Sequence, residues 1–268
     1  FNGYFRVENR FHYTSLEKCT FEYRWYRLTG PAEQGVQESG AWPRNGLVAD
    51  GEPLVDPLYP GEQGSLIVPL PENWREADVL YLEAHDPHGR LIHSWSWPVG
   101  SPDEMTDEMI RPDQTDETDI AVSEIPGMLV LESGGVRLEI DQGDGMVKRV
   151  AVNGTELPFS DGPLFLKDQP EVQEIRHFEE DGAHHVTIRY DRGELLEWIM
   201  YPGGLVDMNL TYRPEKDRIT YTGASFSFPE AEVTSVRYLG NGPYRVWKNR
   251  MAGGTFNVWE KPYNNTIT

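Results

Sequence analysis

The feature that most constrains the fold of this chain is a set of short runs in which apolar and polar residues alternate. The clearest run is C-T-F-E-Y-R-W-Y-R-L, from Cys19 to Leu28. Its first eight residues place every second side chain on the same face of an extended chain: Cys19, Phe21, Tyr23 and Trp25. Strict alternation of this kind is typical of a half-buried β-strand. No stretch combines a convincing helical period with caps, so we predict an all-β chain.

Before residue 100, the strand candidates follow one another closely. They are Tyr4 to Arg10, Cys19 to Leu28, Gly64 to Leu70, Val79 to His85 and Leu91 to Val99. Proline, glycine and asparagine separate them at residues 60–61, 71–73 and 86–89, which are typical turn sequences. About seven short strands in about 100 residues are typical of an immunoglobulin-like sandwich. We therefore assign residues 1–100 to such a domain, and we interpret Trp95 and Trp97 as core residues of its final strand.

Residues 101–125 are predicted to form an acidic linker. The stretch from Ser101 to Glu124 contains nine acidic residues, one basic residue and no aromatic residue. This composition favours a solvated segment between folded units. A calcium loop built from Asp113, Asp116 and Asp119 is the alternative, although the run lacks the glycine and the terminal glutamate of such a loop.

Residues 126–268 are predicted to form a second and larger β-sandwich. Gly134-Gly135 divides an apparent hairpin within Leu129 to Ile140, and Asn153-Gly154 follows the strand candidate Met146 to Val152. The other strand candidates are Val186 to Tyr190, Glu194 to Tyr201, Leu205 to Tyr212, Val233 to Leu239 and Thr255 to Trp259.

Composition excludes several classes of function. The formal net charge is −20 and the pI is about 4.7, which argues against binding to nucleic acid or to an anionic membrane surface. No apolar run approaches the ~20 residues that a membrane-spanning helix needs. Cys19 is the only cysteine, so neither an intrachain disulfide nor a cysteine-based metal cluster can form. Because the chain starts without methionine or a signal peptide, we expect a piece of a longer protein, with bacterial periplasmic and cytoplasmic locations both open.

Two segments carry a resemblance to a known family. The stretch G-M-V-K-R-V-A-V-N-G-T-E-L-P-F ends at Phe159, and Y-L-G-N-G-P-Y-R-V-W-K-N-R ends at Arg250. The second is similar to the Gly-Pro-x-Glu-x-Tyr-x-Asp-Arg segment of the β-galactosidases of glycoside hydrolase family 2. Gly242, Pro243 and Arg250 match it, whereas Arg245, Trp247 and Asn249 replace its glutamate, tyrosine and aspartate. The opening from Val7 to Trp25, with its Asn-Arg pair, resembles the immunoglobulin-like domain of that family.

The resemblance implies that this chain is the non-catalytic C-terminal region of a retaining β-glycosidase. In the family, an immunoglobulin-like domain and a galactose-mutarotase-type sandwich follow a catalytic barrel that carries the two catalytic glutamates. The implied partners are that barrel and a β-galactoside-like carbohydrate bound by the parent enzyme. Since the family's sandwich continues beyond the Gly-Pro segment, we expect the second domain to be cut short; a smaller, complete sandwich is the alternative.

The candidate carbohydrate-binding residues lie in the last predicted hairpin. They are Asn241, Tyr244, Arg245, Trp247, Arg250, Trp259 and Glu260. Aromatic rings can stack beneath sugar rings while neighbouring polar groups bond the hydroxyls. Core packing is the competing interpretation for Trp247 and Trp259. No catalytic residue, metal ligand or cofactor is assigned.

Two alternative functions remain open from the sequence. The sandwich could bind a carbohydrate by itself, or it could be an aldose-epimerase-type enzyme. An epimerase of this type would need a histidine facing a glutamate. His184 and His185 are adjacent, so on a strand they would face opposite sides.

Overall fold

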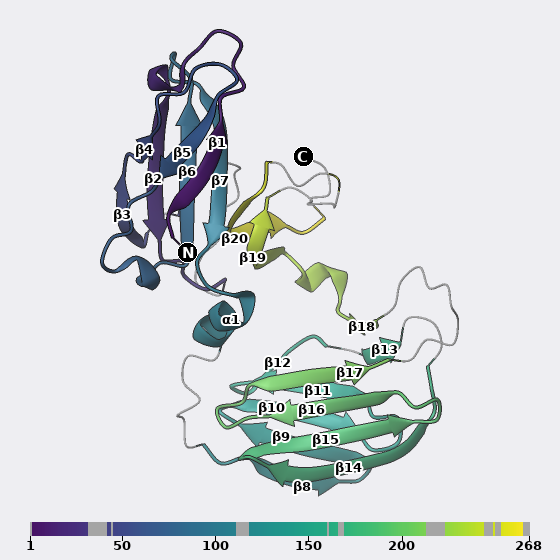
Figure 1. The fold of residues 1–268 in the computed structure, drawn as a ribbon. Helices are drawn as coiled ribbons and strands as arrows, with labels where there is room; N and C mark the ends of the chain where they lie inside the picture. Colours follow the sequence, from purple (N-terminus) through teal and green to yellow (C-terminus); the bar gives the residue numbers. More distant parts are fainter. Residues whose placement is uncertain are drawn as a thin grey trace. The chain divides into compact units, whose positions relative to one another are not determined.

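The computed structural model describes residues 2–31, 42–43, 45–110, 118–159, 161–165, 169–212, 223–243, 249 and 253–264 (Figure 1). Strands account for 54% of the structure and helices for 6%, which confirms the predicted all-β sandwich class. The chain forms two compact units. Unit 1 combines residues 1–110 with residues 234–268, and unit 2 consists of residues 111–233.

Unit 1 contains two antiparallel sheets made from the first seven strands of the chain. The strands are β1 (Tyr4–Glu8), β2 (Thr20–Tyr26), β3 (Leu47–Gly51), β4 (Leu54–Val55), β5 (Gln63–Ile67), β6 (Val79–His85) and β7 (Leu91–Pro98). Their orders are β1-β5-β4 and β3-β2-β6-β7. Two 3-10 helices, η1 (Leu16–Lys18) and η2 (Trp74–Glu76), lie between strands. The described residues before residue 100 thus contain seven strands.

The alternation in β2 decides which side chains form the core of unit 1. Tyr23 and Trp25 point between the sheets, where they join Leu66 of β5 and Leu80 of β6. Trp25 is fully buried. Because a slip of one residue would turn every inward side chain outward, burial of these rings fixes the register of β2.

The last hairpin of the chain also belongs to unit 1. Its strands, β19 (Ser235–Gly242) and β20 (Thr255–Pro262), pair antiparallel. Val258 packs against Val79 and Tyr81 on the outer face of the β3-β2-β6-β7 sheet. The Tyr81 hydroxyl donates to the Phe256 carbonyl oxygen at 2.6 Å, and the Phe256 N–H donates to the Ser96 hydroxyl oxygen at 2.7 Å.

This placement differs from the division at residue 126 that the sequence suggested. That division puts residues 234–268 in the second domain, whereas the structure groups them with the first. The physical reason is that β2 and β6 carry apolar side chains on both faces. Tyr26 and Tyr81 on the outer face need a cover, and the hairpin supplies it.

The acidic segment is also more regular than a solvated linker. The helix α1 (Pro102–Ile110) starts directly after Ser101. The Ser101 N–H donates to the Glu104 carboxylate at 2.7 Å, and the Glu104 N–H donates to the Ser101 hydroxyl at 3.2 Å. These reciprocal bonds form a capping box, and the S-P-D-E sequence contains its signal. Asp119 is exposed, while Asp113 and Asp116 of the calcium alternative lie outside the described residues.

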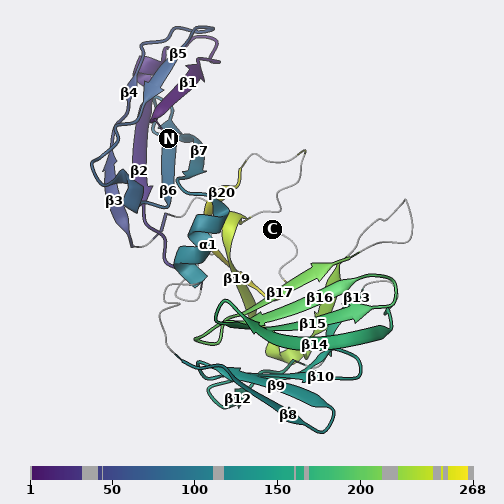
Figure 2. The same ribbon diagram turned by 60° about the horizontal axis from the view of Figure 1, so that its bottom comes forward.

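Unit 2 is a second sandwich, with two larger sheets lying face to face (Figure 2). Their orders are β12-β11-β10-β9-β8 and β14-β15-β16-β17, and a short pair joins β13 to β18. The strands are β8 (Ala121–Ile125), β9 (Met128–Ser133), β10 (Val136–Asp141), β11 (Val147–Val152), β12 (Thr155–Glu156), β13 (Asp161–Phe165), β14 (Val172–Glu180), β15 (Ala183–Tyr190), β16 (Leu195–Met200), β17 (Val206–Thr211) and β18 (Ala224–Ser227). The 3-10 helix η3 (Glu230–Glu232) follows them.

The predicted turns of unit 2 are confirmed. Gly134 and Gly135 join β9 to β10 with positive φ angles of 53° and 79°, and Asn153 and Gly154 join β11 to β12 at 49° and 76°. A Cβ atom on Gly134 would lie 2.0 Å from the Gly203 carbonyl oxygen, so no larger residue fits there. The predictions did not include β14, whose sequence lacks a clear apolar alternation.

Candidate functional site

The hairpin residues predicted to bind carbohydrate do not form one described patch. Tyr244, Arg245, Trp247 and Arg250 lie outside the described residues. The register places Trp259 opposite Tyr238, and Asn241 opposite Phe256. Because neighbouring residues of a strand point to opposite faces, Trp259 lies on one face of the hairpin and Asn241 and Glu260 on the other.

The position of Trp259 fits packing rather than sugar stacking. Its side chain is fully buried, and its indole N–H donates to the carbonyl oxygens of Gly240 and Thr255, both at 3.1 Å. A Cβ atom on Gly242 would lie 2.7 Å from this indole. Gly242, the glycine of the Gly-Pro segment, is therefore needed here because a larger residue would collide with the Trp259 indole. A ring without an exposed face cannot serve as a platform for a sugar, so the interpretation of Trp259 as a binding residue is corrected.

Asn241 and Glu260 are the candidate carbohydrate-binding residues of the described hairpin that keep part of their surface exposed. Asn241 is exposed, and Glu260 is partly exposed. The Glu260 carboxylate lies 3.9 Å from the Nε atom of Arg237, the residue opposite it on β19. The described strands of the hairpin therefore offer polar groups, and the exposed aromatic ring of Tyr263 follows directly after β20.

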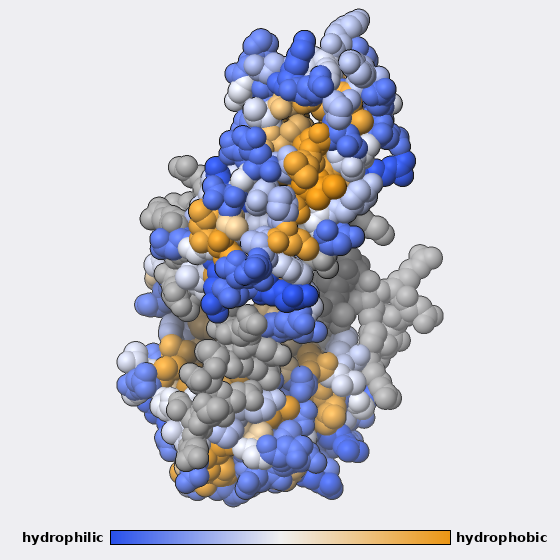
Figure 3. Space-filling view, turned by 60° about the vertical axis from the view of Figure 1, so that its left-hand side comes forward, coloured by the Kyte–Doolittle hydropathy of each residue, from blue (hydrophilic) through white to orange (hydrophobic). Residues whose placement is uncertain are grey.

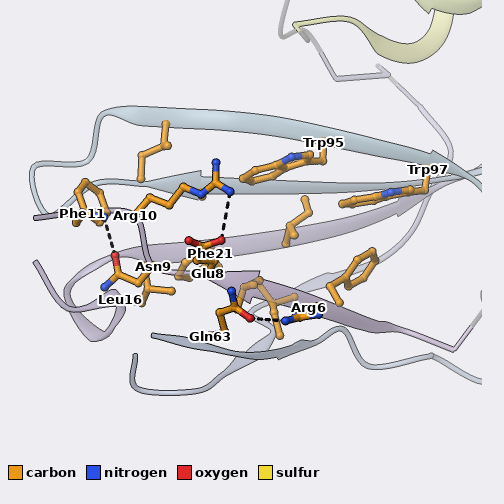
Figure 4. Close-up of a pocket in the computed structure, with 16 residues that line it drawn as sticks. Arg6, Glu8, Asn9, Arg10, Phe11, Leu16, Phe21, Gln63, Trp95 and Trp97 are labelled. Atoms are coloured by element: carbon orange, nitrogen blue, oxygen red, sulfur yellow. Dashed lines mark hydrogen bonds and ion pairs between the residues drawn. The ribbon is translucent and has the colours of Figure 1, made fainter. Parts of the chain in front are cut away.

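Unit 1 contains a groove with a volume of about 740 Å³. It lies at the open side of the sandwich between β1 and β7 (Figure 4). Its apolar lining is Phe5, Val7, Phe11, Leu16, Phe21, Leu66, Leu82, Ala84, Ile92, Trp95 and Trp97. Apolar side chains also reach the surface of this unit in the space-filling view (Figure 3). The groove is thus an opening into the apolar core.

The tryptophans of β7 form one side of this groove. In Figure 4, Trp95 and Trp97 follow one another along the strand, opposite residues of β1 and β2. The Trp97 ring lies 4.5 Å from the ring of Phe5. Trp95 keeps 38% of its surface exposed. The sequence interpretation of both as core residues was therefore incomplete: they point inward, but the core is open beside them.

Polar residues occupy the rim of the groove near the end of β1. The Arg6 guanidinium donates to the Gln63 side-chain oxygen, and the Arg10 Nη2 atom lies 3.2 Å from the Glu8 carboxylate (Figure 4). Both arginines are exposed. Of the described residues that line the groove, Glu8 is the only carboxylate. Hydrolysis of a glycosidic bond needs a pair, so this lining does not supply the groups for that reaction.

Asn9 fixes the loop that closes one end of the groove. It is completely buried, and its side-chain amide donates to the carbonyl oxygens of Thr14 at 2.8 Å and Leu58 at 2.9 Å. Its side-chain oxygen accepts from the Phe11 N–H at 2.9 Å. All its polar atoms are therefore used by the backbone, which gives the Asn-Arg pair noted in the sequence a structural role at its first position.

Both strands that border the groove have a free edge. Within the described residues, β1 pairs only with β5, and β7 pairs only with β6. The groove therefore combines an apolar interior with two strands that end their described sheets, and the Tyr4 N–H at the β1 edge donates to the Asn2 side-chain oxygen at 3.1 Å.

Unit 2 contains the main clusters of histidine. The His177 Nδ1 atom lies 3.2 Å from the His184 Nε2 atom, and His177 Nε2 lies 3.3 Å from Glu124. Burial lowers the pKa of His184, and neighbouring His177 lowers it further. On the opposite face of the same sheet, His185 lies 3.1 Å from Glu197. His184 and His185 thus face opposite sides, as predicted.

The described residues contain no group of three or more histidine, cysteine, aspartate or glutamate side chains placed to hold a metal ion. No helix within them has the length and apolar character needed to cross a membrane.

Comparisons with known proteins do not identify a relative. No family model matches the chain, and no curated protein matches it.

Proposed function

We propose that this chain is a non-catalytic pair of β-sandwich units from a β-galactosidase-like glycoside hydrolase. In this role, it supports the enzyme by holding other polypeptide segments rather than by transforming a sugar. The groove of unit 1 is the observation that carries the proposal. It is large, apolar and bordered by open strand edges, which are the properties of a surface that binds protein.

The sequence resemblance supports the glycosidase context of the proposal. It rests on Gly242, Pro243 and Arg250 and on the order of the two sandwiches along the chain. The parent reaction would be retaining hydrolysis of a β-glycosidic bond, with both catalytic carboxylates in a separate barrel. Supporting that barrel and bordering its sugar site are the roles that the resemblance implies.

An activity assay on this chain alone tests the non-catalytic role. We expect a nitrophenyl β-galactoside to be hydrolysed at the rate of the buffer blank. Turnover at the rate of a typical enzyme, with a kcat above about 1 per second, would contradict the proposal. The Glu197→Gln variant is a control, because loss of any observed turnover in that variant would place the activity in unit 2.

Autonomous carbohydrate binding is the second candidate function. It is favoured by Trp95 and Trp97, which lie near Arg6, Glu8 and Gln63 in one groove. Aromatic rings beside such polar groups can bind sugars. Calorimetric titration with galactosides discriminates the two functions: saturable heat that disappears in Trp95→Ala would favour sugar binding, and no heat would favour the supporting role.

The epimerase alternative has one favourable contact. His185 on β15 lies 3.1 Å from Glu197 on β16, and the Glu197 carboxylate also accepts from Asn209 at 3.3 Å. A carboxylate that orients an imidazole is a known arrangement for proton transfer. Polarimetry of freshly dissolved galactose tests it: acceleration of the anomeric change by the chain, lost in His185→Gln, would favour this alternative.

A further inference from the structure

We propose that His177 and His184 of unit 2 chelate a divalent transition metal ion, for which Zn²⁺ and Cu²⁺ are the best matched. The ion would be bound through His177 Nδ1 and His184 Nε2, with water completing its coordination. Glu124 would hold His177 at the other nitrogen of its ring. This inference goes beyond the proposed function and does not depend on it, so either one can fail without the other.

Pairing of β14 with β15 brings the two imidazoles to the same face of one sheet. His177 lies opposite Val186, and Glu179 lies opposite His184. Because opposite residues share a face and so do residues two apart on one strand, His177, Glu179 and His184 point to the same side. This is the inner side, since Val186 belongs to the core of unit 2. His184 is buried and His177 is exposed, so the pair lies where the core meets water.

The distance between the two ring nitrogens matches the distance across a metal ion. His177 Nδ1 lies 3.2 Å from His184 Nε2, and the ring centroids lie 5.3 Å apart. Zinc binds histidine nitrogen at about 2.0–2.1 Å with tetrahedral angles, which places two such nitrogens about 3.3 Å apart. Without an ion, the two nitrogens share one hydrogen-bonding proton. The ion would take the place of that proton, so the hydrogen bond between the rings marks the site.

Glu124 on β8 orients His177 for this role. Its carboxylate lies 3.3 Å from His177 Nε2, the ring nitrogen that does not face His184. A carboxylate beside one nitrogen keeps the proton there and leaves a lone pair on the other nitrogen, here Nδ1. Because β8 and β14 belong to different sheets, the ion, His177 and Glu124 would form a chain of contacts between the two layers of unit 2 (Figure 1).

The surroundings of the two histidines admit a cation and water. The His177 side chain is 35% exposed and the Glu124 side chain 60% exposed. Glu179 faces His184 across the strands, so each imidazole has a carboxylate nearby. The described residues contain no set of three ligating side chains, so the site is an open one with two protein ligands. Imidazole ligands suit zinc, copper and nickel, whereas Mg²⁺ and Ca²⁺ prefer oxygen.

The test is a calorimetric titration of the whole chain with Zn²⁺, after a chelator has removed any metal. We expect one Zn²⁺ ion per chain, displaced by Cu²⁺ and unaffected by excess Mg²⁺. NMR of the histidine ring nitrogens should show shifts at His177 Nδ1 and His184 Nε2 when Zn²⁺ is added. Absence of saturable Zn²⁺ binding, or shifts confined to other histidines, would overturn the inference.

Single variants locate the site. His177→Gln and His184→Gln should each weaken Zn²⁺ binding by at least about tenfold, since loss of even a hydrogen-bond partner of a ligand has a cost of that size. His185→Gln is the matched control and should keep the wild-type affinity, because His185 lies on the opposite face of β15 beside Glu197. If His184→Gln does not fold, His177→Gln still decides, because His177 is exposed. Wild-type affinity in His177→Gln would overturn the inference.

Glu124→Gln tests the positioning role separately from a structural one. It should weaken Zn²⁺ binding by about tenfold and leave the unfolding temperature of the metal-free chain unchanged. Unaltered affinity would contradict the role given to Glu124. One Zn²⁺ ion per two chains, with a dimer in light scattering, would indicate a bridge between copies and overturn the chelate. Each of these results leaves the non-catalytic role as it stands, because hydrolysis of the nitrophenyl galactoside tests that role separately.

Discussion

The indole of Trp259 is fully buried, and its N–H has two carbonyl acceptors within β19 and β20. Asn241, three positions away along the same hairpin register, is exposed. At the residue scale, burial distinguishes Trp259 from Asn241, although the sequence suggested both as carbohydrate-binding residues. Their variants should therefore differ in stability rather than in affinity for a sugar.

We predict that Trp259→Ala lowers the free energy of unfolding of unit 1 by about 3–5 kcal/mol, because it leaves a cavity and two carbonyl groups without their donor. Asn241→Ala, the matched control, should change it by less than about 0.5 kcal/mol. Urea unfolding followed by tryptophan fluorescence measures both. A small effect for Trp259→Ala would show that the ring does not form part of the packed hairpin.

His184 gives unit 2 a predicted dependence on pH. The groups that face it are His177 and Glu179 on β14, with Glu124 beyond His177 and His185 next to it on β15. Burial, the largest cause, lowers its pKa in the folded state below the value in the unfolded chain. The unfolded state therefore binds more protons below about pH 6.5, and the stability contribution present above that pH is lost as the pH falls.

Urea unfolding of unit 2 at pH 7.5 and at pH 5.5 should show lower stability at the acidic pH. His184→Gln should reduce the difference between the two pH values, because glutamine does not titrate. His12→Gln, at an exposed position of unit 1, is the control and should leave it unchanged. An unchanged pH dependence in His184→Gln would assign the effect to other groups.

At the scale of single elements, α1 depends on its first turn. Ser101 and Glu104 cap each other, and the hydrogen bond from the Ser101 N–H lowers the pKa of Glu104. Met105 is the buried residue among the described side chains of the helix. A helix of this length with one buried side chain depends strongly on its cap.

We predict that Ser101→Ala destabilises α1 by about 1 kcal/mol, the usual cost of a lost N-cap. Hydrogen exchange of the helix amides should become faster, and thermal unfolding of the sheets should change little. Thr106→Ala is the control, because the Thr106 hydroxyl bonds only to the Pro102 carbonyl within the helix. Equal acceleration by both variants would contradict the role of the capping box.

At the scale of the whole molecule, the chain leaves unit 1 after α1, forms unit 2 and returns to unit 1. The core of unit 2 draws all its residues from positions 120–226. The outer cluster of unit 1 needs Leu239, Phe256 and Val258 from the returning hairpin. Unit 2 is thus an insertion with its own core, whereas residues 1–110 lack part of theirs.

Fragment boundaries provide the corresponding test. Residues 111–233 should give one cooperative thermal transition, because their core is complete. Residues 111–268, which keep unit 2 and the hairpin but lack residues 1–110, should bind a hydrophobic dye more strongly, since the hairpin has lost the surface formed by Val79 and Tyr81. Equal dye binding by the two fragments would show that the hairpin does not need unit 1.

Local sequence determined the strands and turns with well-defined signals. Alternation predicted β2, and Gly134-Gly135 and Asn153-Gly154 marked turns because their backbones require positive φ angles. The S-P-D-E signal of α1 was also present, although the acidic composition obscured it. β14 gave no such signal, since its pattern depends on the sheet that it joins.

Tertiary structure alone decided which surfaces are covered. The sequence determined that Trp95 and Trp97 alternate with serine residues, and alternation is a property of one strand. Whether a face then meets another sheet, a returning hairpin or an open groove depends on contacts between residues far apart in the chain. Those contacts bury Trp259 and leave Trp95 beside the open edges of β1 and β7.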